Sequence, residues 1–500
     1  PAGDLVLRFA RTHGPFTIEE AAARFGLAPR TVEAALARLA ARGRVLQGAF
    51  RPARRGREWC ESEVLRQIRQ RSLARLRRQV EPVSAAALGR LSVAWHGVTA
   101  PRRGLDALLD VVEQLQGLPL AASLLEREIL PARLAEFEPS QLDALCSAGE
   151  IAWVGLEPLG ERDGRLALYL TDHLPRLLPP GTPGPELDDR ARRIVEFLSR
   201  AGASFFGAIH EACGGGYPGE TVDRLWDLAW MGLVTNDSFR ALRALTRPPE
   251  RRRRRPDPAP FRSRRLTPPR AEGRWSLVPR PAAPGKRAAT AWASDMATQL
   301  LTRHGIVTRE IVAVENLPGG FSAIYQVLKA MEDAGRVRRG YFVGGLGATQ
   351  FALPGAVDLL RSLRDEPDEP QAVLLAATDP ANPYGAVLRW PASASESGSR
   401  GPTRSVGARV VLVNGTLAAY VGKADRLFLS FLPEEEPARG IAARAVARLW
   451  FEMATAGPEG MLIGEIDGQV VERHALAPFL LEAGFTRRAT GFQAAKERTS

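Results

Sequence analysis

The chain has 500 residues, of which 45% are apolar and 25% are charged. This composition is that of a globular protein and excludes a wholly disordered or collagen-like chain. Of the net charge of +12, residues 247–287 carry +11, because 14 basic residues stand there against three acidic ones.

Neither a membrane segment nor a metal site is indicated. No apolar stretch approaches the ~20 residues that a membrane-spanning helix needs. The start, Pro1-Ala2-Gly3-Asp4, lacks the basic and apolar pattern of a signal peptide, so we expect a cytoplasmic chain cut from a longer polypeptide. Three widely spaced cysteines and six scattered histidines show no disulfide framework and no metal-ligand spacing. The sequence therefore predicts no metal, no cofactor and no membrane partner.

Residues 1–58 have the pattern of a winged helix, a helix-turn-helix followed by a β hairpin. Thr17 and Glu20 have the spacing of a capping box at the start of a helix that ends at Gly26. The next helix has an apolar face at helical spacing, formed by Val32, Leu36 and Leu39.

The same pattern recurs along the chain. A close copy fills residues 288–364, and looser copies fill 119–182 and 183–246. Residues 59–118 form a basic helical segment that is either a solvated connection or a further winged helix. Residues 247–287 form an Arg- and Pro-rich linker, since such a composition cannot bury a core.

Winged helices commonly bind DNA with the second helix in the major groove and the wing on the backbone. Here the second helices have few side chains that could read base edges, so we expect contact with phosphates and not base-specific recognition. The predicted phosphate contacts are Arg30, Arg336, Arg338, Arg339 and the run Arg251, Arg252, Arg253, Arg254 and Arg255. The alternative is that the winged helices dock proteins and the basic segment is a solvated tether.

Residues 365–500 change to short β strands and predict a small β-barrel-like module with C-terminal helices. Strands are expected at 372–377 and 408–413, with a hairpin turn at Asn414-Gly415. The fold class is therefore α+β, with tandem winged-helix modules followed by this module.

The candidate for chemistry is the segment Thr378-Asp379-Pro380-Ala381-Asn382-Pro383-Tyr384-Gly385. Asp379 could activate water or stabilise a developing oxocarbenium ion. Asn382 could hydrogen-bond a base edge, and Tyr384 or Trp390 could stack on the base. The alternative is structural, because an aspartate that ends a strand before a proline commonly forms an Asx turn. No P-loop and no G-x-S-x-G motif occurs.

Several stretches resemble the C-terminal region of the bacterial large helicase-related (Lhr) proteins. They include Gly319-Gly320-Phe321, the wing at 335–351 and residues 376–385. The resemblance implies about five winged helices, a β-barrel-like module, a tail that assembles a tetramer, and a helicase core that precedes this segment in the parent chain. It also implies similarity to AlkZ-type winged-helix DNA glycosylases, and removal of uracil through the aspartate at the position of Asp379.

We therefore predict the C-terminal module of a DNA repair helicase, without ATPase or helicase activity of its own. It binds single-stranded or duplex DNA and excises uracil by hydrolysis of the N-glycosidic bond. Asp379 would activate the water, and Asn382, Tyr384 and Trp390 would shape the base pocket. The alternative is a non-catalytic scaffold that oligomerises and tethers the parent helicase to DNA, which the nearly neutral winged-helix bodies favour.

Overall fold

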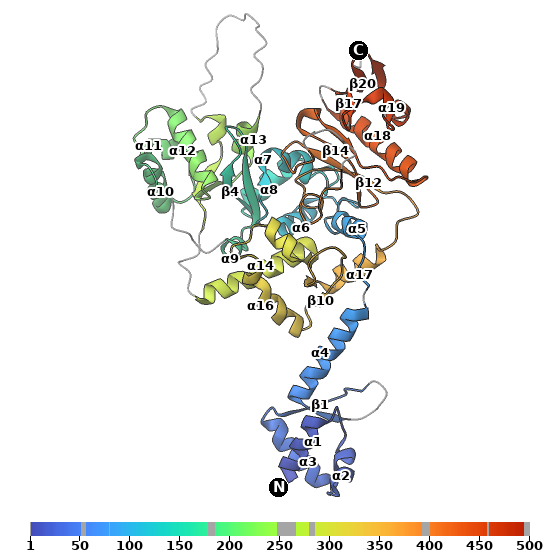
Figure 1. The fold of residues 1–500 in the computed structure, drawn as a ribbon. Coiled ribbons are helices and arrows are strands. Elements are labelled where there is room, and N and C mark those ends of the chain that lie inside the picture. The colour runs from blue at the N-terminus through green and yellow to red at the C-terminus, as the bar shows by residue number, and fades with distance from the viewer. Residues whose placement is uncertain are drawn as a thin grey trace, which may run out of the picture. The chain divides into compact units, whose positions relative to one another are not determined.

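The computed structural model describes residues 2–51, 57–79, 81–178, 186–247, 267–279, 286–392, 401–457 and 460–494. The chain divides into two compact units, Pro1–Glu81 and Pro82–Ser500, and each is described by itself (Figure 1). Among the helices of the described ranges, none is both long and apolar enough to cross a membrane.

The first unit is a winged helix followed by a helix. Its elements are α1 (Ala2–Thr12), α2 (Ile18–Phe25), α3 (Pro29–Ala41), β1 (Val45–Gly48), β2 (Glu58–Glu61) and α4 (Ser62–Gln79). The capping box at Thr17 and Glu20 is confirmed, and the apolar face of α3 is buried as predicted. The β1–β2 hairpin pairs Val45 with Glu61, so it crosses the domain boundary expected after residue 58.

A second winged helix opens the second unit. Its elements are α5 (Ala85–Trp95), α6 (Leu105–Leu115), β3 (Leu120–Ala121), α7 (Ala122–Leu124), a π-helical turn η1 (Leu125–Ile129), α8 (Pro139–Ala148), β4 (Ile151–Pro158), β5 (Gly164–Leu170) and α9 (Leu174–Leu177). The antiparallel sheet has the order β3-β5-β4. The first, short strand therefore lies at the edge of the wing hairpin, against its returning strand.

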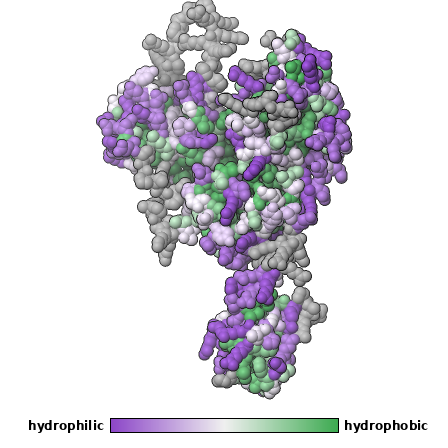
Figure 2. Space-filling view, in the orientation of Figure 1, coloured by the Kyte–Doolittle hydropathy of each residue, from purple (hydrophilic) through white to green (hydrophobic). Residues whose placement is uncertain are grey.

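A third module has the same strand order, β6-β8-β7. Its elements are α10 (Asp189–Ala201), β6 (Ser204–Phe205), α11 (Phe206–Ala212), α12 (Pro218–Trp230), β7 (Val234–Asn236), α13 (Arg240–Thr246) and β8 (Arg274–Leu277). In Figure 2, hydrophilic residues cover much of the visible surface of α10–α12.

Strand β8 corrects the expected linker 247–287. Trp275 on β8 is fully buried and pairs with Ser204 of β6 and Asn236 of β7, so this part of the segment belongs to the third module. The tryptophan supplies the buried apolar surface that the surrounding Arg and Pro residues lack. The run Arg251–Arg255 lies outside the described residues.

A fourth winged helix follows, with the strand order β10-β11-β9. Its elements are α14 (Lys286–His304), β9 (Ile306–Val307), α15 (Arg309–Val314), α16 (Gly320–Asp333), β10 (Arg338–Gly340), β11 (Gln350–Ala352) and α17 (Pro354–Ser362). This module corresponds to the close copy that the sequence predicted at 288–364.

The C-terminal region has two parts. The first is an antiparallel sheet with the order β12 (Ala372–Ala376), β13 (Arg409–Val413), β14 (Thr416–Val421) and β15 (Phe428–Ser430). The predicted turn is confirmed, since Asn414 and Gly415 both have positive φ angles, of 50° and 78°.

The second part is a further module that sequence analysis placed within a single 365–500 domain. It contains α18 (Ala438–Ala456), β16 (Met461–Ile463), β17 (Glu465–Ile466), β18 (Gln469–Val470), α19 (Ala477–Glu482), β19 (Thr486–Arg488) and β20 (Gly491–Ala494). Its sheet order, β16-β20-β19, repeats that of the winged helices. The predicted α+β fold with tandem winged-helix modules is therefore confirmed.

Candidate active site

The second unit encloses a cavity of about 790 Å³. Three walls meet around it: the segment from Leu118 to Ile129 with α5, the segment from His304 to Asn316, and the loops that flank the β12–β13 pair. Thr378, Pro380 and Asn382 of the predicted segment line this cavity, whereas Asp379 itself does not. A cavity at the junction of several modules is the usual setting of a ligand site.

The loop after β12 is held by an Asx turn. The backbone N–H of Ala381 donates to Oδ1 of Asp379 at 2.7 Å, and the N–H of Asn382 donates to the Asp379 carbonyl at 3.0 Å. This is the structural alternative that the sequence left open for an aspartate before a proline.

The carboxylate of Asp379 forms a buried, two-pronged ion pair with Arg133. The two guanidinium nitrogens donate to Oδ1 at 2.7 Å and to Oδ2 at 2.9 Å, and both side chains are at most 1% exposed. Arg133 follows the π-helical turn η1, whose Ile129 carbonyl accepts a further bond from it at 2.8 Å. In the described conformation, both carboxylate oxygens of Asp379 are therefore engaged with protein groups.

The expected base-pocket residues mainly hold the same loop. The side-chain amide of Asn382 donates to the Ala377 carbonyl at 2.9 Å and its oxygen accepts from the Tyr384 N–H at 3.1 Å. The Tyr384 hydroxyl donates to the Gly415 carbonyl at 3.1 Å. The Trp390 ring packs edge-on against Tyr420. Of the three, only Asn382 lines the cavity.

Arg404 also holds this loop in place. Its guanidinium donates to three loop carbonyls, those of Asn382 at 2.8 Å, Tyr384 at 3.1 Å and Asp379 at 3.1 Å. Burial lowers the pKa of Arg404 to about 10, against the opposing effect of the Asp379 charge. The cavity wall thus contains a partly buried cation.

The fourth winged helix contributes a His–Glu pair. His304 Nε2 lies 2.7 Å from a carboxylate oxygen of Glu315, whose other oxygen accepts from the fully buried Arg303. Burial acts to raise the pKa of Glu315, but the Arg303 charge and the His304 hydrogen bond outweigh it and lower the pKa to about 2. Arg303 also donates to the Gln116 carbonyl. The Arg303–Glu315 pair therefore connects the fourth winged helix with the second.

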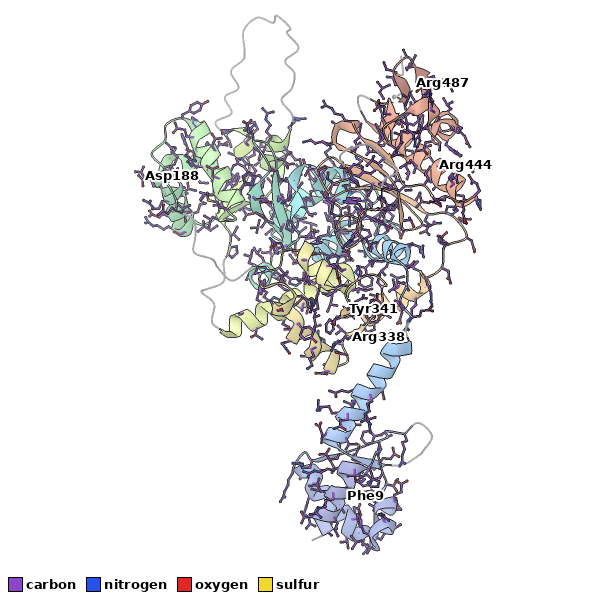
Figure 3. All side chains as sticks on the ribbon, in the orientation of Figure 1. Phe9, Asp188, Arg338, Tyr341, Arg444 and Arg487 are labelled. Atoms are coloured by element: carbon purple, nitrogen blue, oxygen red, sulfur yellow. The ribbon has the colours of Figure 1, made fainter. Side chains whose placement is uncertain are left out.

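The predicted phosphate contacts have mixed surroundings. Arg30 and Arg336 are exposed. Arg338, shown beside Tyr341 in Figure 3, pairs with Asp358 at 2.9 Å, and Arg339 lies over the Phe351 ring. Arg336, Arg338 and Arg339 belong to the same unit as the cavity, and none of the three lines it.

Sequence reasoning missed Arg133, Arg303, Arg404 and Glu315. Each is a single charged residue in an apolar or loop context, and its partner lies elsewhere in the chain. Within the described ranges, no three His, Cys, Asp or Glu side chains gather into a group that could hold a metal ion.

Comparisons with known proteins place these modules in a family. The description "Large helicase-related protein, winged-helix domain" matches residues 286–372 and again residues 83–171. Residues 4–47 match "Transcriptional regulator, AbiEi antitoxin". The chain is 40% identical to a Mycolicibacterium smegmatis protein named "Lhr helicase/ probable uracil glycosylase", over 99% of this chain and 34% of that protein.

Over nearly its whole length the chain is similar to large helicase-related (Lhr) proteins. It is also 34% identical to the Escherichia coli "Lhr helicase/uracil glycosylase", over 98% of this chain and 33% of that protein. The chain therefore spans about a third of the length of the curated proteins that it matches. Among solved structures, the Streptomyces sahachiroi DNA glycosylase AlkZ is similar at a TM-score of 0.43 and 14% identity, over 73% of this chain and 96% of that one.

Proposed function

We propose that this chain binds DNA and excises uracil from it by hydrolysing the N-glycosidic bond, with the cavity of the second unit as the active site. The observation that carries the proposal is the pair of relatives named as uracil glycosylases, whose similarity spans nearly the whole of this chain. The cavity supports it, because its volume of about 790 Å³ falls in the ordinary range for small-molecule sites and accommodates an extruded nucleotide.

In this proposal, Asp379 is a positioning residue. Its carboxylate holds Arg133 on one side and the Asx turn on the other, so it fixes the loop that forms one wall. Releasing the carboxylate to activate water would leave the buried Arg133 charge without its partner, which typically costs about 3–5 kcal/mol. That cost favours a positioning role over the water-activating role that the resemblance implied.

DNA would be held by the exposed arginines outside the cavity. Phosphate contact needs no base-reading side chains and is weakened by salt. Arg30 on α3 and Arg336 in the wing of the fourth module are exposed and suit this role. In the parent protein we expect a helicase core in the same polypeptide, and the homotetramer remains a prediction.

The test is incubation of the purified chain with a labelled single strand carrying one uracil, followed by alkali to cleave abasic sites. Wild-type protein should produce a break at the uracil. Ala386→Trp, which places an indole at the cavity wall, should abolish the break because the base can no longer enter. Ala438→Trp, at an exposed position at the start of α18, is the matched control and should retain activity.

Cleavage that survives Ala386→Trp in a folded protein would move the reaction out of this cavity. No cleavage by wild-type protein that is folded and binds DNA would refute excision.

The second candidate is a scaffold that oligomerises and tethers the parent helicase. The observation that favours it is the charge distribution, since outside 247–287 the chain carries a net charge of only +1. Light scattering of the purified chain tests it: a tetramer would support the scaffold, and a monomer would remove its main argument.

A further inference from the structure

Arg404 has the chemistry of a ligand-binding cation rather than that of an ion-pair partner. A guanidinium has five N–H donors, and the bonds of Arg404 within the described residues go to three backbone carbonyls. No carboxylate in those residues accepts from it. Two donors are therefore left for another partner, on a side chain that lines the cavity.

The nearby charges do not cancel that of Arg404. The carboxylate of Asp379 is bonded to Arg133, so the two guanidinium groups and one carboxylate carry a net charge of +1. Backbone carbonyls orient a guanidinium but add no net charge. Because Arg404 is partly buried, such a cation interacts more strongly with an anion than it would in bulk water.

We propose that Arg404 donates hydrogen bonds to a carbonyl oxygen of the target pyrimidine and stabilises the negative charge that develops on the ring as the base leaves. This inference rests on the proposed function and adds a catalytic residue to it. The ligand is the anionic oxygen of a departing pyrimidine.

The bond between the sugar C1′ and the pyrimidine N1 breaks, and its electron pair stays on the ring, where it is delocalised onto the carbonyl oxygens that face Arg404. Water forms the new bond to C1′ and gives up one proton, and the ring anion takes up one proton. The products are an abasic sugar and a neutral base, with no oxidant or reductant.

In the competing role, Arg404 only holds the loop in place, through its three hydrogen bonds to backbone carbonyls. A leaving-group comparison separates the two roles. Single-turnover rates should be measured with uracil and with 5-fluorouracil at the same position of the same strand. The fluorinated ring carries negative charge more readily and so needs less stabilisation.

Arg404→Gln should slow excision of uracil on the order of 10²–10³-fold, as expected for the loss of one preorganised donor, and should slow excision of 5-fluorouracil much less. Arg404→Lys, which keeps the charge, should lie between wild type and Arg404→Gln. The ratio of the two rates is independent of how much of the variant is folded, because the same active molecules meet both substrates. An equal loss of excision rate for both bases would mean that Arg404 only holds the loop in place, and would overturn the proposal.

A binding measurement keeps this inference separate from the proposed function. Equilibrium dialysis should compare 5-nitrouracil, which is ionised at neutral pH, with neutral thymine. Wild type should prefer the ionised ring, and Arg404→Gln should lose that preference even if the chain excises nothing. Two results would refute a base-oxygen site and point to a phosphate contact. The first is a wild type that shows no preference for the ionised ring. The second is an Arg404→Gln variant that loses as much affinity for uracil-free oligonucleotide as it loses for the pyrimidines.

Discussion

The buried Arg133–Asp379 pair gives the sharpest prediction. Asp379→Asn keeps an oxygen for the Ala381 N–H but removes the charge that balances Arg133. Arg133→Met removes the cation and leaves the carboxylate buried. Each single change leaves one member of the pair without its partner, whereas the double variant removes both charges of the pair.

The magnitude follows from the burial. Both side chains are at most 1% exposed, and breaking such a pair typically costs about 3–5 kcal/mol. That corresponds to an increase of roughly 10²-fold to 5 × 10³-fold in the equilibrium constant for opening of the loop after β12. Replacing both partners costs much less, because neither charge of the pair remains to be desolvated. We expect the double variant to be at least as stable as either single variant.

Hydrogen exchange of the loop measures this directly. The amides of Ala377, Asp379 and Asn382 are all hydrogen-bonded, so their exchange reports opening of the loop. The matched control is Asp110→Asn, which breaks a pair with Arg102 that is more than half exposed and should change stability by no more than about 1 kcal/mol. Additive losses in the double variant, or unchanged exchange in Asp379→Asn, would refute the reasoning.

The same variants decide the role of Asp379 in excision. If it is a positioning residue, the double variant should recover the excision that Asp379→Asn loses, since the loop is restored. A double variant with a protected loop and no excision would return Asp379 to the water-activating role.

Three further predictions follow from other features. Because the pKa of Glu315 is lowered to about 2, it contributes stability above its unfolded pKa near 4.3, and this is lost as the pH falls toward about 2. In urea unfolding, wild type should lose on the order of 3 kcal/mol more than Glu315→Gln across that window, and parallel curves would contradict this. In thermal melts, Gly415→Ala should destabilise the second unit by at least about 2 kcal/mol, because the new Cβ would lie 2.2 Å from the Ala86 carbonyl oxygen and the residue has a φ of +78°. The control variant Gly468→Ala has a similar φ of +76° but open space around its Cβ, so it should cost only about 1 kcal/mol in the same melts. Replacing Arg251–Arg255 by serine should flatten the dependence of log affinity on log salt, by up to about 0.7 per lost phosphate contact on a single strand, and an unchanged slope in filter binding would exclude the segment from DNA contact.

Local signals in the sequence predicted most of the repeated fold. The capping box at Thr17 and Glu20 and the Asn414-Gly415 turn involve residues close in the chain, so their patterns carry the structure directly. Strand β8 was missed because Trp275 stands among Arg and Pro residues, whose composition outweighs one aromatic residue. The last module was placed within a single 365–500 domain because its strands are only two to four residues long, too short for an alternating pattern to mark them.

The candidate site was predicted only in part. Sequence reasoning found the loop at 378–385 and weighed the Asx turn that forms there. It could not find the partner of Asp379, because nothing in the local pattern of Arg133 distinguishes a buried arginine from a solvated one. Long-range ion pairs of this kind depend on how separate modules pack, which periodicity does not encode.

The separation of Arg133 from Asp379 also constrains how the protein is made. The two residues are 246 positions apart, so at about 5–20 residues per second the ribosome adds the carboxylate roughly 10–50 s after the arginine. During that interval the carboxylate that pairs with Arg133 is absent. The cavity of the second unit can be completed only after the loop at 378–387, which supplies part of its lining, has been translated.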